Sequence, residues 1–134
     1  MWHPASDYDA GELARACREA EILFDPRGDL DPEAIYLQIV RPGVVSLPPV
    51  VSPEVVGRFG LLTVTMPPPS VIAAAKLTRA SARDLEDVAW WVRERSLDLD
   101  EVSDAIGAMP RAIDRETALD NMVLVELVTL RDRL

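Results

Sequence analysis

The stretch "KLTRASARDLED", residues 76–87, combines helical spacing with a concentration of charge. If it is helical, Lys76, Arg79, Arg83 and Asp87 follow one another at intervals of three or four residues and share one face. Three cations in a row repel one another by a few tenths of a kcal/mol per pair, about the strength of other helix-surface pairs. In an acidic chain, stability alone does not call for this row, whereas an anion held between the cations would.

A second interpretation of the same row needs no ligand. Asp84, Glu86 and Asp87 are close enough in sequence to neutralise the cations in a solvated network, and surface ion pairs contribute little to stability. The residues leave both readings open, a phosphate-binding pocket and a solvated helix face.

Helix signals lie on both sides of this stretch. "SARD" at 81–84 has the spacing of a capping box, which predicts a helix from Ala82 to about Arg95. Before it, a helix is expected over 71–80, with Ser70 as its cap after three prolines.

Two more helices are expected towards the C-terminus. "DLDE" at 98–101 predicts the start of a helix that ends near Gly107, and Asp114 is expected to open the last one. The last helix has an apolar face that belongs either to the core or to a dimer seam. That face comprises Leu119, Met122, Val123, Val125, Leu127 and Leu130.

The N-terminal half predicts one helix and short strands. Asp9 caps a helix expected to stop near Phe24. The apolar stretch 34–40 is expected to form a buried strand, and 61–65 a second strand. The proline-containing stretch 44–60 is expected to be an edge strand or an extended loop over the core.

These elements predict an α+β fold in which a small mixed sheet is followed by a C-terminal helical bundle. The length of 134 residues suits one domain, with a helix and short strands over 1–66 and a helical part over 70–131.

Composition excludes several classes of function. The net charge of −9 argues against binding to duplex nucleic acid. His3 is the one histidine and Cys17 the one cysteine, so a histidine–cysteine zinc site, a serine–histidine triad and an internal disulfide are not expected. Without a signal peptide or an apolar run of about 18 residues, the chain is expected in the cytoplasm.

The segment "PPPSVIAAAKLTRASARDLEDVAWW" resembles the C-terminal motif of nucleotidyltransferase-like proteins related to AbiEii-type toxins. The likeness covers roughly residues 34–130 and lies in Lys76–Leu77, Arg79, Arg83–Asp84 and Asp87, with a weaker match at Asp120 and Glu126. The spacing fits an uncharacterised branch of that group better than the toxins themselves.

The resemblance implies a nucleotidyltransferase-like fold with a nucleotide pocket. Lys76 would neutralise the triphosphate, and Arg79 or Arg83 would orient it. Asp84 or Asp87 would support a magnesium ion or hold a cation in place. Such a site also needs a glycine–serine turn and an Asp-x-Asp pair on a strand.

The chain departs from that pattern because none of its six glycines is followed by serine. Asp7 and Asp9 are the candidates for the metal-binding pair, although Asp9 also serves as a helix cap. The pairs at 29–31 and 98–100 are better explained as a turn and a helix cap. A reading frame that starts further upstream would supply the missing parts.

Two functions therefore stay open. The first is a degenerate nucleotidyltransferase-fold protein that acts as a binding or regulatory module, in a setting related to toxin–antitoxin systems. The second is an active enzyme that uses magnesium and a nucleoside triphosphate. Trp90 and Trp91 are adjacent on a helix, so one should be buried and the other partly exposed. The exposed ring would serve a protein interface, a homodimer or base stacking, or would cover a neighbouring helix.

Overall fold

The computed structural model describes residues 8–28, 30–31, 33–40, 46–48, 51–60 and 62–131. The chain divides into two compact units, Met1–Val45 and Ser46–Leu134. Two compact units can belong to one domain or to two, so the single domain expected over 1–134 stays a prediction.

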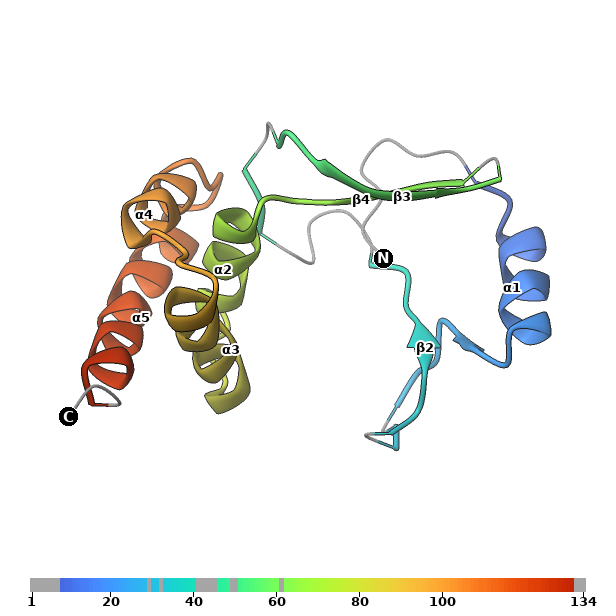
Figure 1. The fold of residues 1–134 in the computed structure, drawn as a ribbon, viewed down its shortest axis with the longest axis horizontal. Coiled ribbons are helices and arrows are strands. Elements are labelled where there is room, and N and C mark those ends of the chain that lie inside the picture. The colour runs from blue at the N-terminus through green and yellow to red at the C-terminus, as the bar shows by residue number, and fades with distance from the viewer. Residues whose placement is uncertain are drawn as a thin grey trace. The chain divides into compact units, whose positions relative to one another are not determined.

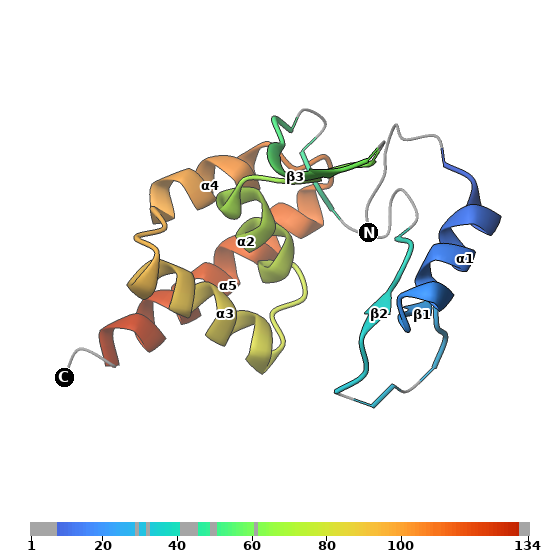
Figure 2. The ribbon, with the colours of Figure 1, turned by 45° about the vertical axis from the view of Figure 1, so that its right-hand side comes forward.

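The first unit contains one helix and a short parallel strand pair (Figure 2). Helix α1 spans Ala10–Glu19, and the side chain of Asp9 accepts a hydrogen bond from the backbone N–H of Glu12 at 2.9 Å. The helix ends five residues before the predicted Phe24 because Glu21 adopts a left-handed backbone, with φ of 57°. The thiol of Cys17 is buried, as its place on the apolar face predicted.

The strands of the first unit are shorter than expected. Strand β1, Leu23–Phe24, pairs in parallel with β2, Tyr36–Leu37, so only two residues of the predicted strand 34–40 join a ladder. Ile35 and Tyr36 are exposed, which contradicts the prediction that this strand is buried.

The second unit begins with an antiparallel hairpin. Strand β3, Glu54–Phe59, pairs with β4, Leu62–Met66, and Gly60 takes a positive φ of 62° where the chain reverses. The structure thus has two separate two-stranded sheets, and no ladder joins them within the described residues. The single mixed sheet expected from the sequence is wrong.

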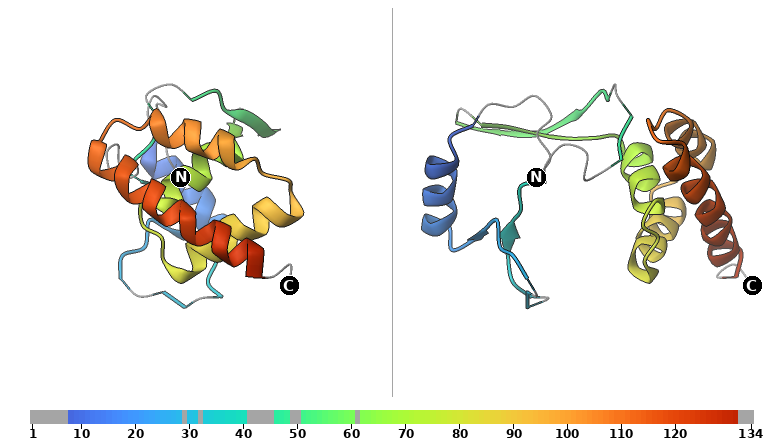
Figure 3. Two further views of the ribbon diagram at one scale, coloured as in Figure 1. Left: turned by 90° about the vertical axis from the view of Figure 1, so that its left-hand side faces the viewer. Right: turned by 180° about the vertical axis from the view of Figure 1, so that it is seen from behind.

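Four helices follow the hairpin and form the bundle (Figures 1 and 3). They are α2 (Pro69–Leu77), α3 (Ala82–Glu94), α4 (Leu99–Gly107) and α5 (Ala112–Arg131). The α+β class, with small sheets followed by a C-terminal bundle, is therefore confirmed.

Three helix starts illustrate how local sequence places the bundle. Ser81 and Asp84 form the predicted capping box of α3, and Asp98 caps α4 by accepting from the N–H of Asp100 at 2.9 Å. The cap expected at Ser70 is wrong. Helix α2 starts at Pro69, two residues before the predicted start at 71, and its N-cap is Pro68, which offers no side-chain acceptor.

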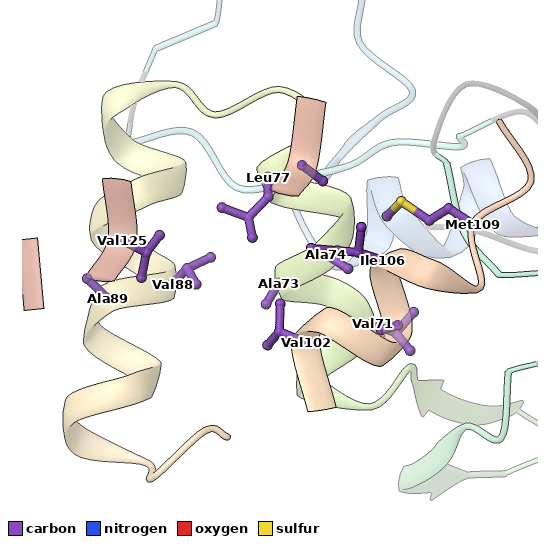
Figure 4. Close-up of a cluster of buried hydrophobic side chains, with 12 residues drawn as sticks. Val71, Ala73, Ala74, Leu77, Val88, Ala89, Val102, Ile106, Met109 and Val125 are labelled. Atoms are coloured by element: carbon purple, nitrogen blue, oxygen red, sulfur yellow. The ribbon is translucent and has the colours of Figure 1, made fainter. Parts of the chain in front are cut away.

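The core of the bundle lies where α2 meets the other three helices (Figure 4). Leu77, Val88, Val102, Ile106 and Val125 are fully buried there, and the small Ala73 and Ala74 let the neighbouring helices approach α2 closely. Leu47 and Val51 pack against the same core, so the segment before β3 covers part of the bundle.

Helix α5 packs through only part of the predicted face, since Met122 and Val125 belong to that face and reach the core. Ala118, Val125 and Thr129 are buried and Met122 packs against the core, whereas Leu119, Val123 and Leu127 are exposed. Large side chains occur on both sides of α5, so periodicity does not select the packed side. The close approach to α2 and α3 selects it, through the small Ala118. The side chain of Leu130 lies outside the described residues.

A helix that crosses a bilayer needs about 20 predominantly apolar residues in a row. Within the described part of the chain, none has both the length and the apolar content needed to cross a bilayer.

We expect Ser81→Ala to lower the free energy of unfolding by about 0.5–2 kcal/mol, because Ser81 caps α3. Ser70→Ala is the matched control, since Ser70 lies inside α2, and it should change stability by less than about 0.5 kcal/mol. Chemical denaturation of both variants measures the difference. Equal effects would contradict the assignment of the cap.

Candidate functional site

The charged stretch 76–87 comprises the end of α2, a short turn and the start of α3, so it is not one helix. Helix α2 ends at Leu77, Ala80 has a left-handed backbone with φ of 45°, and α3 starts at Ala82. The N–H of Ala80 donates to the carbonyl of Lys76 at 2.8 Å, which closes the end of α2. The straight row of cations expected from a continuous helix is therefore wrong.

The turn instead gathers the charges around Asp84, in the first turn of α3. Arg79 donates to both carboxylate oxygens, from Nε to Oδ2 at 2.7 Å and from Nη2 to Oδ1 at 2.6 Å. Ser81 donates to Oδ2 from its backbone N–H at 3.2 Å and from its hydroxyl at 2.7 Å. Asp84 is therefore bonded from both sides of the turn, and its side chain is only 2% exposed.

Lys76 extends this network from α2 to the second turn of α3. Its Nζ lies 2.7 Å from Oδ2 of Asp87 and 3.4 Å from Oδ1 of Asp84. We call these five residues, Lys76, Arg79, Ser81, Asp84 and Asp87, the α2–α3 clasp. The clasp joins the last turn of α2 to the first two turns of α3.

The electrostatics of the clasp follow from these contacts. The bidentate hydrogen bond from Arg79 holds the pKa of Asp84 well below its usual range, with help from Ser81 and Lys76 and against the effect of burial. The same hydrogen bond raises the pKa of Arg79. Asp84 is thus a permanent anion at neutral pH, and its charge is already compensated within the protein.

Arg83 takes no part in the clasp. It lies on the exposed side of the first turn of α3, and its guanidinium forms no ion pair with any residue that the structure describes. Of the three predicted phosphate-binding cations, Lys76 and Arg79 are therefore paired internally, and only Arg83 remains available.

The pair Asp7 and Asp9, expected as magnesium ligands, lies at the start of the chain. Asp9 caps α1 in the first unit, and Asp7 lies outside the described residues. Among the residues described, no group of three or more Asp, Glu, His or Cys side chains has the geometry of a metal site. The oxygens of Asp84 already accept from Arg79, Ser81 and Lys76, so they have no lone pair left for a cation.

The two tryptophans separate as adjacent helical positions require. Trp91 is half-buried and packs against the core, whereas Trp90 is exposed. The guanidinium carbon of Arg95 lies 5.6 Å from the centre of the Trp90 ring, which is within the range of a cation–π contact.

Asn121 on α5 is a contact that the sequence did not point to. Its Nδ2 donates to the carbonyl of Leu77 at 2.9 Å, so it satisfies a backbone acceptor at the end of α2. It lies in the weak motif matched at Asp120 and Glu126, and those two side chains are exposed. The residue between the motif positions, and not the carboxylates, reaches the clasp region.

Comparisons with protein-family models, with curated proteins and with solved structures found no match for this chain. The resemblance to the AbiEii-related group therefore stays a prediction from the motif residues.

We expect Asp84→Asn to cost about 2–4 kcal/mol at neutral pH, because it removes the charge that Arg79, Ser81 and Lys76 hold in place. The pKa of Asp84 is lower in the folded chain than in the unfolded chain, so its contribution is complete above about pH 5 and is lost as the pH falls below about 4. Urea denaturation across this range should show the variant and the wild type converging in acid.

Asp87→Asn is the matched control, since the side chain of Asp87 is 44% exposed and bonds Lys76 alone within the clasp. It should cost less than about 1 kcal/mol. A loss as large as that of Asp84→Asn, or a difference that persists unchanged in acid, would contradict the central role of Asp84.

Proposed function

We propose that this chain is a non-catalytic binding or regulatory module, built on a degenerate nucleotidyltransferase-like fold and acting in the cytoplasm. The observation that supports this most is the state of Asp84. The motif would assign Asp84 to catalysis or to metal support. Both of its carboxylate oxygens instead accept hydrogen bonds from Arg79, Ser81 and Lys76.

Magnesium does not fit this donor set. A magnesium ion is bound through carboxylate oxygens in near-octahedral geometry, and the guanidinium of Arg79 occupies that side of Asp84. Binding a metal here would require the clasp to open and the left-handed turn at Ala80 to rearrange. No step of nucleotidyl transfer can be assigned to these residues as they lie.

The charges of the clasp also argue against tight nucleotide binding. Lys76 and Arg79 carry two positive charges, which the two carboxylates of Asp84 and Asp87 balance. A triphosphate would have to displace carboxylates that already make charge-assisted hydrogen bonds. Arg83 and the outer edge of Arg79 remain, which supports only weak attraction of anions.

A role in protein binding agrees better with the exposed surface of the bundle. Trp90 is a large aromatic side chain on the outside of α3, and aromatic residues are common anchors of protein interfaces. A partner protein or a second copy of the chain would bury its ring. The resemblance to AbiEii-related proteins suggests a regulatory setting related to toxin–antitoxin systems.

The first test is a calorimetric titration of the chain with ATP, GTP, CTP and UTP, each with and without magnesium. We expect no binding tighter than about millimolar, because the clasp is internally neutral. Lys76→Ala should act on stability instead and lower it by about 1 kcal/mol.

Arg83→Ala is the control, because Arg83 belongs to the same motif but not to the clasp, and it should leave stability unchanged within about 0.5 kcal/mol. Micromolar affinity that needs magnesium and is lost in Lys76→Ala would overturn the proposal. Transfer of a nucleoside monophosphate to any acceptor would overturn it as well.

The second test concerns Trp90 as an interface anchor. If a homodimer forms through it, Trp90→Ala should shift sedimentation towards the monomer without loss of helical circular dichroism, because the exposed ring leaves the core intact. Trp91→Ala should lower thermal stability instead, since Trp91 packs on the core. An unchanged mass for both variants would contradict a homodimer anchored by either tryptophan, and the partner would then be a different protein.

A further inference from the structure

Helix α5 carries an apolar surface on the side opposite to the core. Leu119, Val123 and Leu127 follow one another at intervals of four residues and form one row, with Ile113 and Leu124 beside it. These five side chains are between 42% and 65% exposed. We call them the outer row of α5.

The outer row is not explained by packing within the bundle. Helix α5 buries Ala118, Val125 and Thr129 on its other side, so its contribution to the core is complete without the outer row. Scattered exposed apolar residues are ordinary, but apolar residues that follow one another at helical spacing on an exposed side of a helix are typical of an interaction surface. The spacing is that of a helix that binds alongside another helix.

Carboxylates lie on both sides of the line formed by Leu119, Val123 and Leu127. Glu116 and Asp120 lie between that line and Leu124, Glu126 lies on the other side, and all three carboxylates are exposed. The described side chains on this face of α5 include no cation. The face therefore combines an apolar centre with a rim of negative charge.

The negative charge of this rim distinguishes between two possible binding partners, a second copy of the chain and a basic helix of another protein. A second α5 helix on this face would bring only carboxylates, and no described cation, from its own flanks to the contact. The net charge of −9 adds repulsion between copies. A helix with apolar residues at the same spacing and lysine or arginine beside them satisfies the apolar row and the rim together.

We propose that the outer row of α5 is the docking surface for a basic amphipathic helix of a partner protein. This rests on the binding role proposed above and names the chemistry of the partner. The apolar row supplies the area that is removed from water, and the carboxylates supply orientation and a faster encounter with a basic segment.

The test uses the full chain and a fluorescent synthetic peptide of roughly 18 residues, which is long enough to form a helix. The peptide places leucines on one helical face and lysines elsewhere. Two comparison peptides separate the contributions: one has the same composition in scrambled order, and the other keeps the leucine face but has glutamate in place of lysine. Anisotropy titrations should show binding of the first peptide that is about tenfold tighter than of either comparison peptide.

The decisive variant replaces Leu119, Val123 and Leu127 with glutamine, which removes the apolar row without changing charge or helix propensity much. Its affinity should fall about tenfold or more. The matched control replaces three exposed apolar residues of the hairpin, Val55, Val56 and Phe59, with glutamine. It should bind like the wild type.

A second variant, Glu116→Gln with Asp120→Asn and Glu126→Gln, keeps the apolar row and should weaken binding and reduce its dependence on salt. Circular dichroism confirms that each variant is folded. Equal binding of the scrambled peptide, or equal effects of the helix and hairpin variants, would overturn the inference.

Sedimentation of the chain alone tests whether a second copy of the chain occupies this face. A wild-type dimer that becomes monomeric in the Leu119, Val123 and Leu127 variant would show that a second copy covers this face, and would also overturn the inference. These outcomes are distinct from nucleotidyl transfer or nucleotide binding, which would instead overturn the proposed function.

Discussion

The hydrogen bonds that Asp84 accepts hold together the turn on which the bundle depends. Two donors come from Arg79, which lies before the turn, and two from Ser81, which caps α3. Together they set the direction in which α3 leaves α2. Because Leu77 of α2 and Val88 of α3 both belong to the buried core, the direction of α3 decides which of its side chains face that core (Figure 4).

The cost of burying Asp84 shows why the clasp has so many members. A buried carboxylate is expensive unless it is paired and hydrogen-bonded. Arg79 alone, with a side chain that is 72% exposed, would give up much of its attraction to solvent screening. Ser81 and Lys76 complete the set of acceptor bonds, so the site is stable as a neutral group. The residue types that would hold a phosphate are here the ones that hold a turn.

Local signals in the sequence were sufficient for much of the bundle. The capping box at Ser81 and the acidic start at Asp98 predicted two helix starts, because a cap is a contact among residues that are neighbours in sequence. The left-handed turn at Ala80 had no such signal, since alanine rarely adopts a positive φ. The row of cations was therefore predicted on a helix that in fact ends at Leu77. The hydrogen bond from Asn121 to Leu77 joins residues 44 positions apart, so no short sequence pattern predicts it. Helix α5 is apolar on both sides, so its packed side depends on neighbours that periodicity does not reveal.

The clasp also has a consequence for the order of folding. Its bonds join residues only 3 to 11 positions apart, whereas the hydrogen bond from Asn121 on α5 to Leu77 spans 44. The entropy lost in closing a loop grows with its length, and helical hairpins form among the fastest elements of a chain. We therefore expect α2 and α3 to pair early, with the hydrogen bonds and ion pairs of the clasp already formed. Helix α5 would then dock onto a preformed surface, and Asn121 would be among the last residues to find its partner.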